Sequence, residues 1–196
     1  AVVLTGTQHS EATRTLLRKS QARVVEVWNL ADKPIDMNVG FSNREAAVAV
    51  TTYLIRSGRK RIAMVCGPRS VNDRARDRHA GFVAAMNAHK MPVDLFEEVS
   101  DQAGVHLVGP LVDALVKKDP CMDAIFCSGD AYAMAAAFHC RRRGWDVPKR
   151  LAIAGIGDAP MAALMSPALT TAQVPGAEMG VKAAEMLVAA FEGHAP

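Results

Sequence analysis

Short runs of apolar residues that lack a period-2 alternation recur along this chain, and helical patterns fill the stretches between them. Val24–Val27, Ile62–Cys66 and Ala124–Cys127 are three such runs. Continuous apolar strands are typical of parallel sheets whose two faces are both covered by helices. Strands that alternate with helices indicate right-handed βαβ units. We therefore predict an α/β fold built on doubly wound parallel sheets.

The expected elements follow from these patterns. Strands are predicted at 2–5, 24–27, 39–41, 62–66, 124–127, 151–156 and 170–174, with a weaker one near 97–99. Helices are predicted at 10–20, 43–57, 72–90, 103–118, 130–143, 159–164 and 178–192. Ser10 and Asn43 are suitable N-caps, and Gly58 ends the second helix. Because residues 1–5 already resemble the middle of a buried strand, we expect an internal piece of a longer α/β protein.

Two polar segments interrupt the alternation. Residues 29–38 precede a short strand, and residues 172–175 join a strand to the last helix, where Pro175 suits a first helical turn. If both are crossings, residues 43–172 form one subdomain, and residues 1–41 plus 175–193 form part of a second, incomplete one. A ligand cleft would then lie between the two subdomains, at the carboxyl ends of the strands.

Charge and cysteine content narrow the function classes. The net charge of this 196-residue chain is +3, which is too small to indicate nucleic-acid binding by these residues. Its four cysteines form no CxxC pair, and no histidine has zinc-site spacing, so we expect free thiols, no metal and a cytoplasmic protein. No apolar run approaches the roughly 18 residues of a membrane span, so no membrane partner is expected.

Polar residues follow several predicted strands, where a doubly wound sheet binds its ligands. Those that we expect near a ligand are His9, Glu26, Ser128, Asp130 and Asp158. They contain no nucleophile–base–orienter series, so catalysis is not predicted. His9 could be a hydrogen-bonding residue or a general base. Asp130 could contact a ligand or act only at the start of its own helix.

Arg74 and Arg78 give the sharper signal. They lie four residues apart in the first two turns of a predicted helix, so they share one face of it. Two guanidinium groups on one helix face could bind an anion. The alternative is a solvated pair on a charged helix. No nucleotide cofactor is expected, because Gly155–Asp158 lacks a third glycine and no phosphate-binding loop is present.

The order of the motifs carries a resemblance that covers nearly the whole chain. The motifs are Val39-Gly40-Phe41-Ser42-Asn43, residues 58–63, Gly67-Pro68, residues 78–82, residues 123–130, Val147-Pro148, residues 151–158 and residues 167–171. In this order they resemble the effector domain of the lac repressor family (LacI/GalR). Residues 4–9 and 34–37 further resemble the gluconate-type repressors of that family.

The resemblance implies a periplasmic-binding-protein-like fold, a homodimer, and operator DNA bound through a helix-turn-helix headpiece that precedes this chain. It also implies a small-molecule effector between two subdomains. Arg78 matches the arginine before Ala-Gly-Phe, and Glu26 matches an acid after the second strand. Val99 stands where some members have an aromatic that stacks on the effector. Gly129 and Gly157 replace an asparagine and an aspartate, which leaves Asp158.

These replacements suggest an anionic effector, because losing a carboxylate removes repulsion while Arg74 and Arg78 attract negative charge. We therefore predict a repressor of sugar or sugar-acid utilisation genes, with gluconate or a relative as effector. Its two halves would hinge at two segments, Phe41-Ser42-Asn43 and Ala172-Gln173-Val174. The family also implies dimer contacts at 132–140 and 161–165. The alternatives to a repressor are a periplasmic sugar-binding protein and an enzyme with His9 or Asp130 as its general base.

Overall fold

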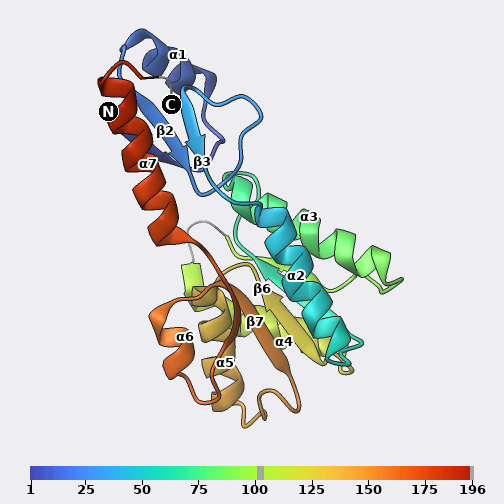
Figure 1. The fold of residues 1–196 in the computed structure, drawn as a ribbon. Coiled ribbons are helices and arrows are strands. Elements are labelled where there is room, and N and C mark those ends of the chain that lie inside the picture. Colours follow the sequence, from blue (N-terminus) through green and yellow to red (C-terminus); the bar gives the residue numbers. More distant parts are fainter. Residues whose placement is uncertain (101–103, 195–196) are drawn as a thin grey trace. The chain divides into compact units, whose positions relative to one another are not determined.

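The computed structural model describes residues 1–100 and 104–194. The chain separates into two units (Figure 1). Unit 1 contains residues 1–42, 71–74 and 175–196, and unit 2 contains residues 43–70 and 75–174. The segment 71–74 lies within the range that the sequence pattern assigned to the other half. It groups with unit 1 because the Asp73 carboxylate accepts hydrogen bonds from Thr7 and Asn29.

Unit 2 contains a five-stranded parallel sheet with the order β5-β4-β6-β7-β8. Its strands are β4 (Ile62–Cys66), β5 (Phe96–Glu98), β6 (Ala124–Cys127), β7 (Ala152–Gly157) and β8 (Thr170–Gln173). Its helices are α2 (Asn43–Arg56), α3 (Asp73–Ala88, whose first two residues belong to unit 1), α4 (Val108–Lys118), α5 (Asp130–Arg142) and α6 (Pro160–Leu164). The crossover order and the parallel pairing confirm the predicted α/β fold with doubly wound parallel strands.

Apolar cores cover both faces of this sheet. On β4, Ala63 and Val65 belong to a core cluster with residues of α4 and α5. Ile62, Met64 and Cys66 belong to a second cluster with residues of α2 and α3. Alternate residues of one strand therefore enter different cores, which explains why the run is apolar throughout. Figure 1 shows α2 on the opposite side of the sheet from α5.

Unit 1 is smaller. It has a three-stranded parallel sheet with the order β1-β2-β3, formed by β1 (Val2–Thr5), β2 (Val24–Val27) and β3 (Met37–Val39). Two helices accompany it, α1 (Glu11–Lys19) and α7 (Gly176–Phe191). Its apolar cluster joins β2 and β3 to one face of α7, whereas α1 has no buried residue. Ser10 caps α1, since its Oγ accepts the Thr13 N–H at 3.1 Å.

The third strand begins two residues before the predicted range. Asn38 causes this shift, because its side chain donates to the carbonyls of Glu26 and Asn29, both at 2.9 Å. A Cβ on Gly40 would lie 2.3 Å from the Asn29 carbonyl oxygen, so only glycine allows this approach. Further along, a 3-10 turn (Gly104–Leu107) precedes α4 and leaves Pro110 in the first helical turn. Residue 103, the predicted start of that helix, lies outside the described residues.

Candidate functional site

Arg78 lies next to the carboxyl end of β6 in unit 2. Its Nη1 donates to the carbonyl of Ser128, the residue that follows the strand. Its Nε donates to Asn43 Oδ1 at 2.8 Å, at the start of α2. The Arg78 side chain is half-buried, whereas Asn43 and Ser128 are buried. Two fixed bonds therefore hold a partly accessible guanidinium at the edge of the sheet where parallel strands end.

Ser128 also joins two strand ends. Its Oγ accepts the backbone N–H of Gly67, which follows β4, at 3.0 Å. The same residue thus connects the loops after β4 and β6 and supports Arg78 through its carbonyl. Since its hydroxyl is already engaged inside unit 2, Ser128 has a positioning role in addition to any contact with a ligand.

The Asp130 carboxylate is engaged within unit 2. Asp130 is 6% exposed at the start of α5; its Oδ2 accepts the Ala159 N–H at 2.8 Å, and its Oδ1 accepts the Thr171 hydroxyl at 2.6 Å. It therefore connects α5 to β8 and to the segment after β7. Both carboxylate oxygens thus accept hydrogen bonds within unit 2, and a ligand contact by Asp130 stays a prediction.

Asp158 is exposed and follows β7 directly. Its N–H donates to Thr171 Oγ1 at 3.2 Å, and its φ is +54°, a left-handed conformation that few residues with a side chain adopt. Gly157 before it has a φ of +154°. The backbone turns sharply here and carries the Asp158 side chain into solvent.

In unit 1, Glu26 is fully buried at the end of β2. Its Oε1 lies 2.9 Å from His9 Nε2, and its Oε2 accepts the Ile35 N–H at 2.8 Å. Glu26 therefore fixes the loop after β1 and the loop after β2 together. The structure brings the two predicted residues His9 and Glu26 into contact with each other, and the carboxylate is used for that contact.

Asp73 was not among the predicted contacts, although it is the most heavily bonded carboxylate of unit 1. Its oxygens accept the Thr7 N–H at 2.6 Å, the Thr7 hydroxyl at 2.8 Å, Asn29 Nδ2 at 3.2 Å and the Arg74 N–H at 2.9 Å. Burial raises the pKa of Asp73, but these donors outweigh burial and leave the pKa below its ordinary value. The sequence around Asp73 did not indicate this network, because Thr7 and Asn29 are distant from Asp73 in the sequence.

Other predicted residues are Arg74, which was predicted to contact the effector, and the residues of the two predicted hinge segments. Arg74 is half-buried in the first turn of α3. Ala172 and Gln173 belong to β8 and pair with β7, and Val174 is the last residue of unit 2. Phe41 and Ser42 are the last residues before α2. Unit 1 ends its first segment at residue 42, so these positions coincide with passages of the chain from one unit to the other.

Val99 is fully buried in unit 2. It belongs to the apolar cluster under α4 and α5, and its N–H donates to the Cys66 carbonyl at 2.8 Å. A side chain in the core is not available to a ligand at the surface. The expectation that Val99 contacts the effector is therefore wrong, and the residue is a core residue that follows an edge strand.

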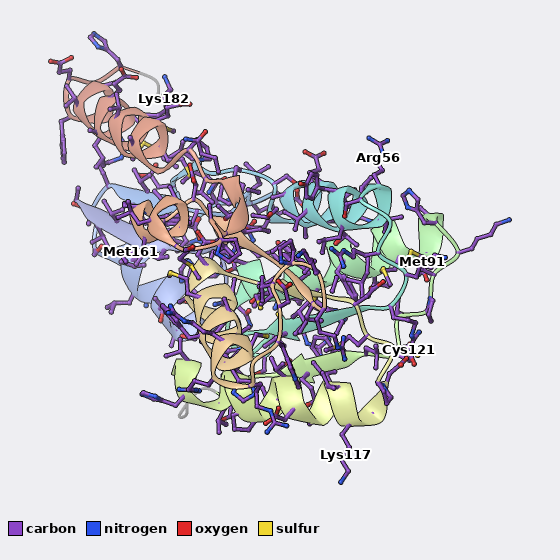
Figure 2. The ribbon with its side chains drawn as sticks, turned by 90° about the horizontal axis from the view of Figure 1, so that it is seen from below. Arg56, Met91, Lys117, Cys121, Met161 and Lys182 are labelled. Atoms are coloured by element: carbon purple, nitrogen blue, oxygen red, sulfur yellow. The ribbon has the colours of Figure 1, made fainter. Side chains whose placement is uncertain are left out.

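Three of the four thiols are buried in unit 2. All four cysteines are free; Cys66, Cys127 and Cys140 are buried, whereas Cys121, labelled in Figure 2, is exposed. Burial raises the pKa of Cys66 and of Cys140 to about 11, so both stay protonated at neutral pH. Among residues 1–100 and 104–194, no three His, Cys, Asp or Glu side chains are grouped to hold a metal ion. Over the same ranges, no helix is long and apolar enough to cross a bilayer.

An apolar groove of about 600 Å³ lies on unit 2. It runs between the end of α5, the segment 144–147 and the segment 161–169. Phe138, Met161 and Leu164 at this groove are 53%, 56% and 76% exposed, and Figure 2 labels Met161 on α6. Three large apolar side chains in one exposed patch mark a surface suited to a protein contact.

Comparison with known proteins gives consistent matches. Residues 51–196 match the family described as periplasmic binding protein-like domain. The chain is 32% identical over 196 residues to the HTH-type transcriptional regulator GntR of Escherichia coli (strain K12), covering 98% of this chain and 57% of that protein. It is 27% identical over 194 residues to the HTH-type transcriptional regulator IdnR of the same strain, covering 98% and 58%.

A solved structure is also similar. The crystal structure of the transcription regulator GntR from Chromobacterium violaceum superposes with a TM-score of 0.89 at 32% identity, over 100% of this chain and 72% of that chain. This chain spans a little over half the length of the two Escherichia coli relatives.

Proposed function

Since this chain belongs to the periplasmic binding protein-like domain family and to its LacI/GalR-type regulators, we propose that it is the effector-binding and dimerisation part of a transcriptional repressor. The effector is a sugar acid such as gluconate, and the regulated genes serve its use. Operator DNA is bound by a segment outside this chain, as the HTH-type names of the relatives suggest. We place the protein in the cytoplasm, where free thiols persist.

The observation that carries the effector proposal is the fixed guanidinium of Arg78. Arginine binds a carboxylate through two parallel N–H donors, and this pairing is stronger when the arginine is preorganised. Asn43 and the Ser128 carbonyl restrain Arg78. A carboxylate is the ligand group that suits a restrained guanidinium, and the likeness to GntR and IdnR supports a sugar acid.

The acidic residues Asp130 and Asp158 of unit 2 are compatible with an anionic effector. Asp130 is buried and engaged by Thr171 and Ala159, and Asp158 extends into solvent from a left-handed turn. Gly157 contributes no side chain. A neutral sugar is usually held by carboxylate and amide oxygens on its hydroxyls, whereas here Asn43 Oδ1 and both Asp130 carboxylate oxygens already accept hydrogen bonds within unit 2. The balance of charge favours an anion.

Calorimetric titration with D-gluconate and with D-glucitol tests the proposal. The two ligands share a carbon chain and differ only in a carboxylate against a neutral CH₂OH group. We expect clear preference for gluconate, and Arg78→Gln should weaken gluconate binding by about 10- to 150-fold, which corresponds to about 1.5–3 kcal/mol for a charged hydrogen bond. Preference of the unchanged protein for glucitol would refute an anionic effector.

Arg76→Gln is the matched control, because it removes the same charge from the same helix two residues away. Arg76 is exposed. Its replacement should alter gluconate affinity by less than about threefold, since exposed charges are screened by solvent and salt. A similar loss in both variants would mean that only the overall charge of α3 matters. The thermal midpoint of each variant shows whether the fold is retained.

We further propose that the apolar groove on unit 2 forms the homodimer contact. A charged residue in its centre should prevent association, because an unpaired charge is costly to bury. Leu164→Asp should therefore convert the dimer into a monomer, as measured by light scattering after size exclusion. Its thermal midpoint should be close to that of the wild-type protein diluted until the dimer dissociates. Tyr53→Asp is the control, since Tyr53 is 56% exposed on α2, away from the groove residues. A dimer that survives Leu164→Asp refutes this contact.

The proposed mechanism is a shift between orientations of the two units, with bending at residues 41–43 and 172–174. A ligand can shift such an equilibrium only by its different affinities for the two states. No turnover is part of this mechanism. A periplasmic sugar-binding protein is the second candidate, because the matching family is described as a periplasmic binding protein-like domain. The regulators among the relatives and the free thiols favour the repressor.

A further inference from the structure

Four side chains of unit 2 form a cluster beside the edge strand β5 that the candidate site does not include. The Arg69 guanidinium lies over the Phe96 ring, with Cζ 4.5 Å from the ring centroid, and its Nε donates to Glu98 Oε2 at 2.6 Å. The His79 ring meets the Phe96 ring edge to face, with centroids 4.6 Å apart. All four residues are half-buried. The cluster thus joins the loop after β4, the helix α3 and the strand β5.

The contact between Arg69 and His79 requires a neutral imidazole. Arg69 Nη1 lies 3.3 Å from His79 Nδ1. A guanidinium nitrogen can only donate, so Nδ1 must accept, and the single proton of the ring then sits on Nε2. Protonation of Nδ1 would set a second donor and a second positive charge against Arg69. The hydrogen bond would be lost, and repulsion would take its place.

The surroundings of His79 disfavour its protonated form. Arg69 faces the ring from the loop after β4 and Glu98 from β5, and Arg76 precedes it by three residues on α3. Burial lowers the pKa of His79 from its ordinary 6.5, Arg69 lowers it further, and Glu98 offsets only part of this. The stability that neutral His79 gives is therefore complete above pH 6.5 and is lost as the pH falls from there towards the lowered pKa.

The cluster fixes the loop that follows β4. Gly67 in this loop donates its N–H to Ser128 Oγ at 3.0 Å, and Ser70 is the last residue of unit 2 before the segment 71–74, which groups with unit 1. The strand β5 has three residues and one neighbour in the sheet, β4. Short edge strands and loops have few contacts and open more easily than the core of a sheet. A contact that joins such a loop to such a strand therefore limits their local opening.

We propose that this cluster is a pH-sensitive clasp, which holds the loop after β4 on β5 while His79 is neutral and releases the loop when His79 is protonated. The proton comes from solvent and binds Nδ1. The clasp involves no effector, so it operates in the free and in the liganded protein alike. Its opening loosens the chain next to residue 70, where it passes from one unit to the other.

Hydrogen exchange of the full-length protein, measured by mass spectrometry at pH 7.5 and at pH 5.5, tests the clasp. Protection is taken relative to the unfolded chain at each pH, which removes the intrinsic pH dependence of exchange. The Val99 N–H, which donates to the Cys66 carbonyl at 2.8 Å, reports on the end of β5. Protection of residues 96–99 should fall by about 3- to 10-fold at pH 5.5, the size expected for one lost hydrogen bond. The buried strand β6 should keep its protection.

His79→Asn is the decisive variant. Its Oδ1 can accept from Arg69 but does not titrate in this range, so protection of residues 96–99 should differ by less than about twofold between the two pH values. His89→Asn is the matched control, because His89 is an exposed histidine directly after α3; it should respond as the wild type does. Arg69→Met keeps an apolar stem but no donor, and it should have the low protection at both pH values.

Three results would overturn the clasp. The first is equal protection of residues 96–99 in the wild type at both pH values. The second is a wild-type response in His79→Asn or in Arg69→Met. The third is a lost response in His89→Asn, because a histidine outside the cluster would then be responsible. Thermal midpoints show whether each variant folds, and His79→Gln takes the place of His79→Asn if the asparagine variant does not.

Discussion

Unit 2 and unit 1 are built on the same parallel sheet plan, yet they are stabilised differently. The sheet of unit 2 has apolar clusters on both faces, and β4 and β6 are buried at every position. In unit 1, β1 alternates between half-buried and exposed residues, and α1 buries none. Polar contacts of Glu26 and Asp73 take a larger part there. Within the residues of this chain, unit 2 has apolar packing on both faces of its sheet, whereas unit 1 combines one smaller apolar cluster with the hydrogen bonds of Glu26 and Asp73.

The largest expected effect on stability comes from removing an aromatic side chain from the core of unit 2. Phe126 is fully buried on β6, with its ring centroid 6.3 Å from that of Phe82. Phe126→Ala should lower the free energy of unfolding by about 3–5 kcal/mol, because transfer and cavity terms add. Urea denaturation measures the loss, and Phe126→Leu should cost less. A loss below about 1.5 kcal/mol would mean that packing does not dominate in unit 2.

The second test addresses the polar half. Asp73→Asn keeps the size of the side chain but replaces a carboxylate oxygen with a donor, so it should cost about 1–3 kcal/mol at pH 7. The pKa of Asp73 in the folded protein is below its ordinary value of 3.8. Its contribution to stability is therefore complete above that value and is lost as the pH falls through the lowered pKa.

The measurement is the difference between the urea midpoints of the wild type and Asp73→Asn at pH 7 and at successively lower pH. The difference should shrink below pH 3.8, where Asp73 becomes protonated first in the unfolded chain. Asp32→Asn is the control, because Asp32 is an exposed aspartate of the same unit; it should cost less than about 0.5 kcal/mol. A difference that is constant with pH would contradict the role of the Asp73 charge.

The same contrast explains how far the sequence could predict the fold. Strands such as 62–66 and 124–127 are predicted to the residue, because burial on both faces makes every position apolar. The third strand was predicted too late, since its position depends on Asn38 and on the bidentate pair of Arg23 with Asp36, at 2.7 and 3.0 Å. Contacts between residues that are distant in sequence leave no periodic signal.

For the candidate site too, sequence patterns predicted the positions at strand ends but not the contacts between distant residues. The rule that ligands meet the carboxyl ends of parallel strands selected Ser128, whose carbonyl accepts a hydrogen bond from Arg78. The ligand role of Arg78 stays a prediction. The rule could not show that Asp130 accepts a hydrogen bond from Thr171, which lies 41 residues away, or that Glu26 lies beside His9. Polar residues at strand ends are of two kinds, those that meet ligands and those that fix loops, and only coordinates separate them. Val99 failed for a related reason, because an apolar residue after an edge strand can enter the core.

The smallest expected effect comes from an apolar residue of unit 1. Leu16 on α1 is 68% exposed, whereas Leu115 on α4 of unit 2 is fully buried. Leu16→Ala should change the free energy of unfolding by no more than about 0.5 kcal/mol, because little apolar area is lost and alanine favours the helix. Leu115→Ala should cost about 2–5 kcal/mol in the same urea experiment. A cost above about 1.5 kcal/mol for Leu16→Ala would break the comparison, because it would mean that a partner surface buries α1 in solution and that unit 1 also depends on packing.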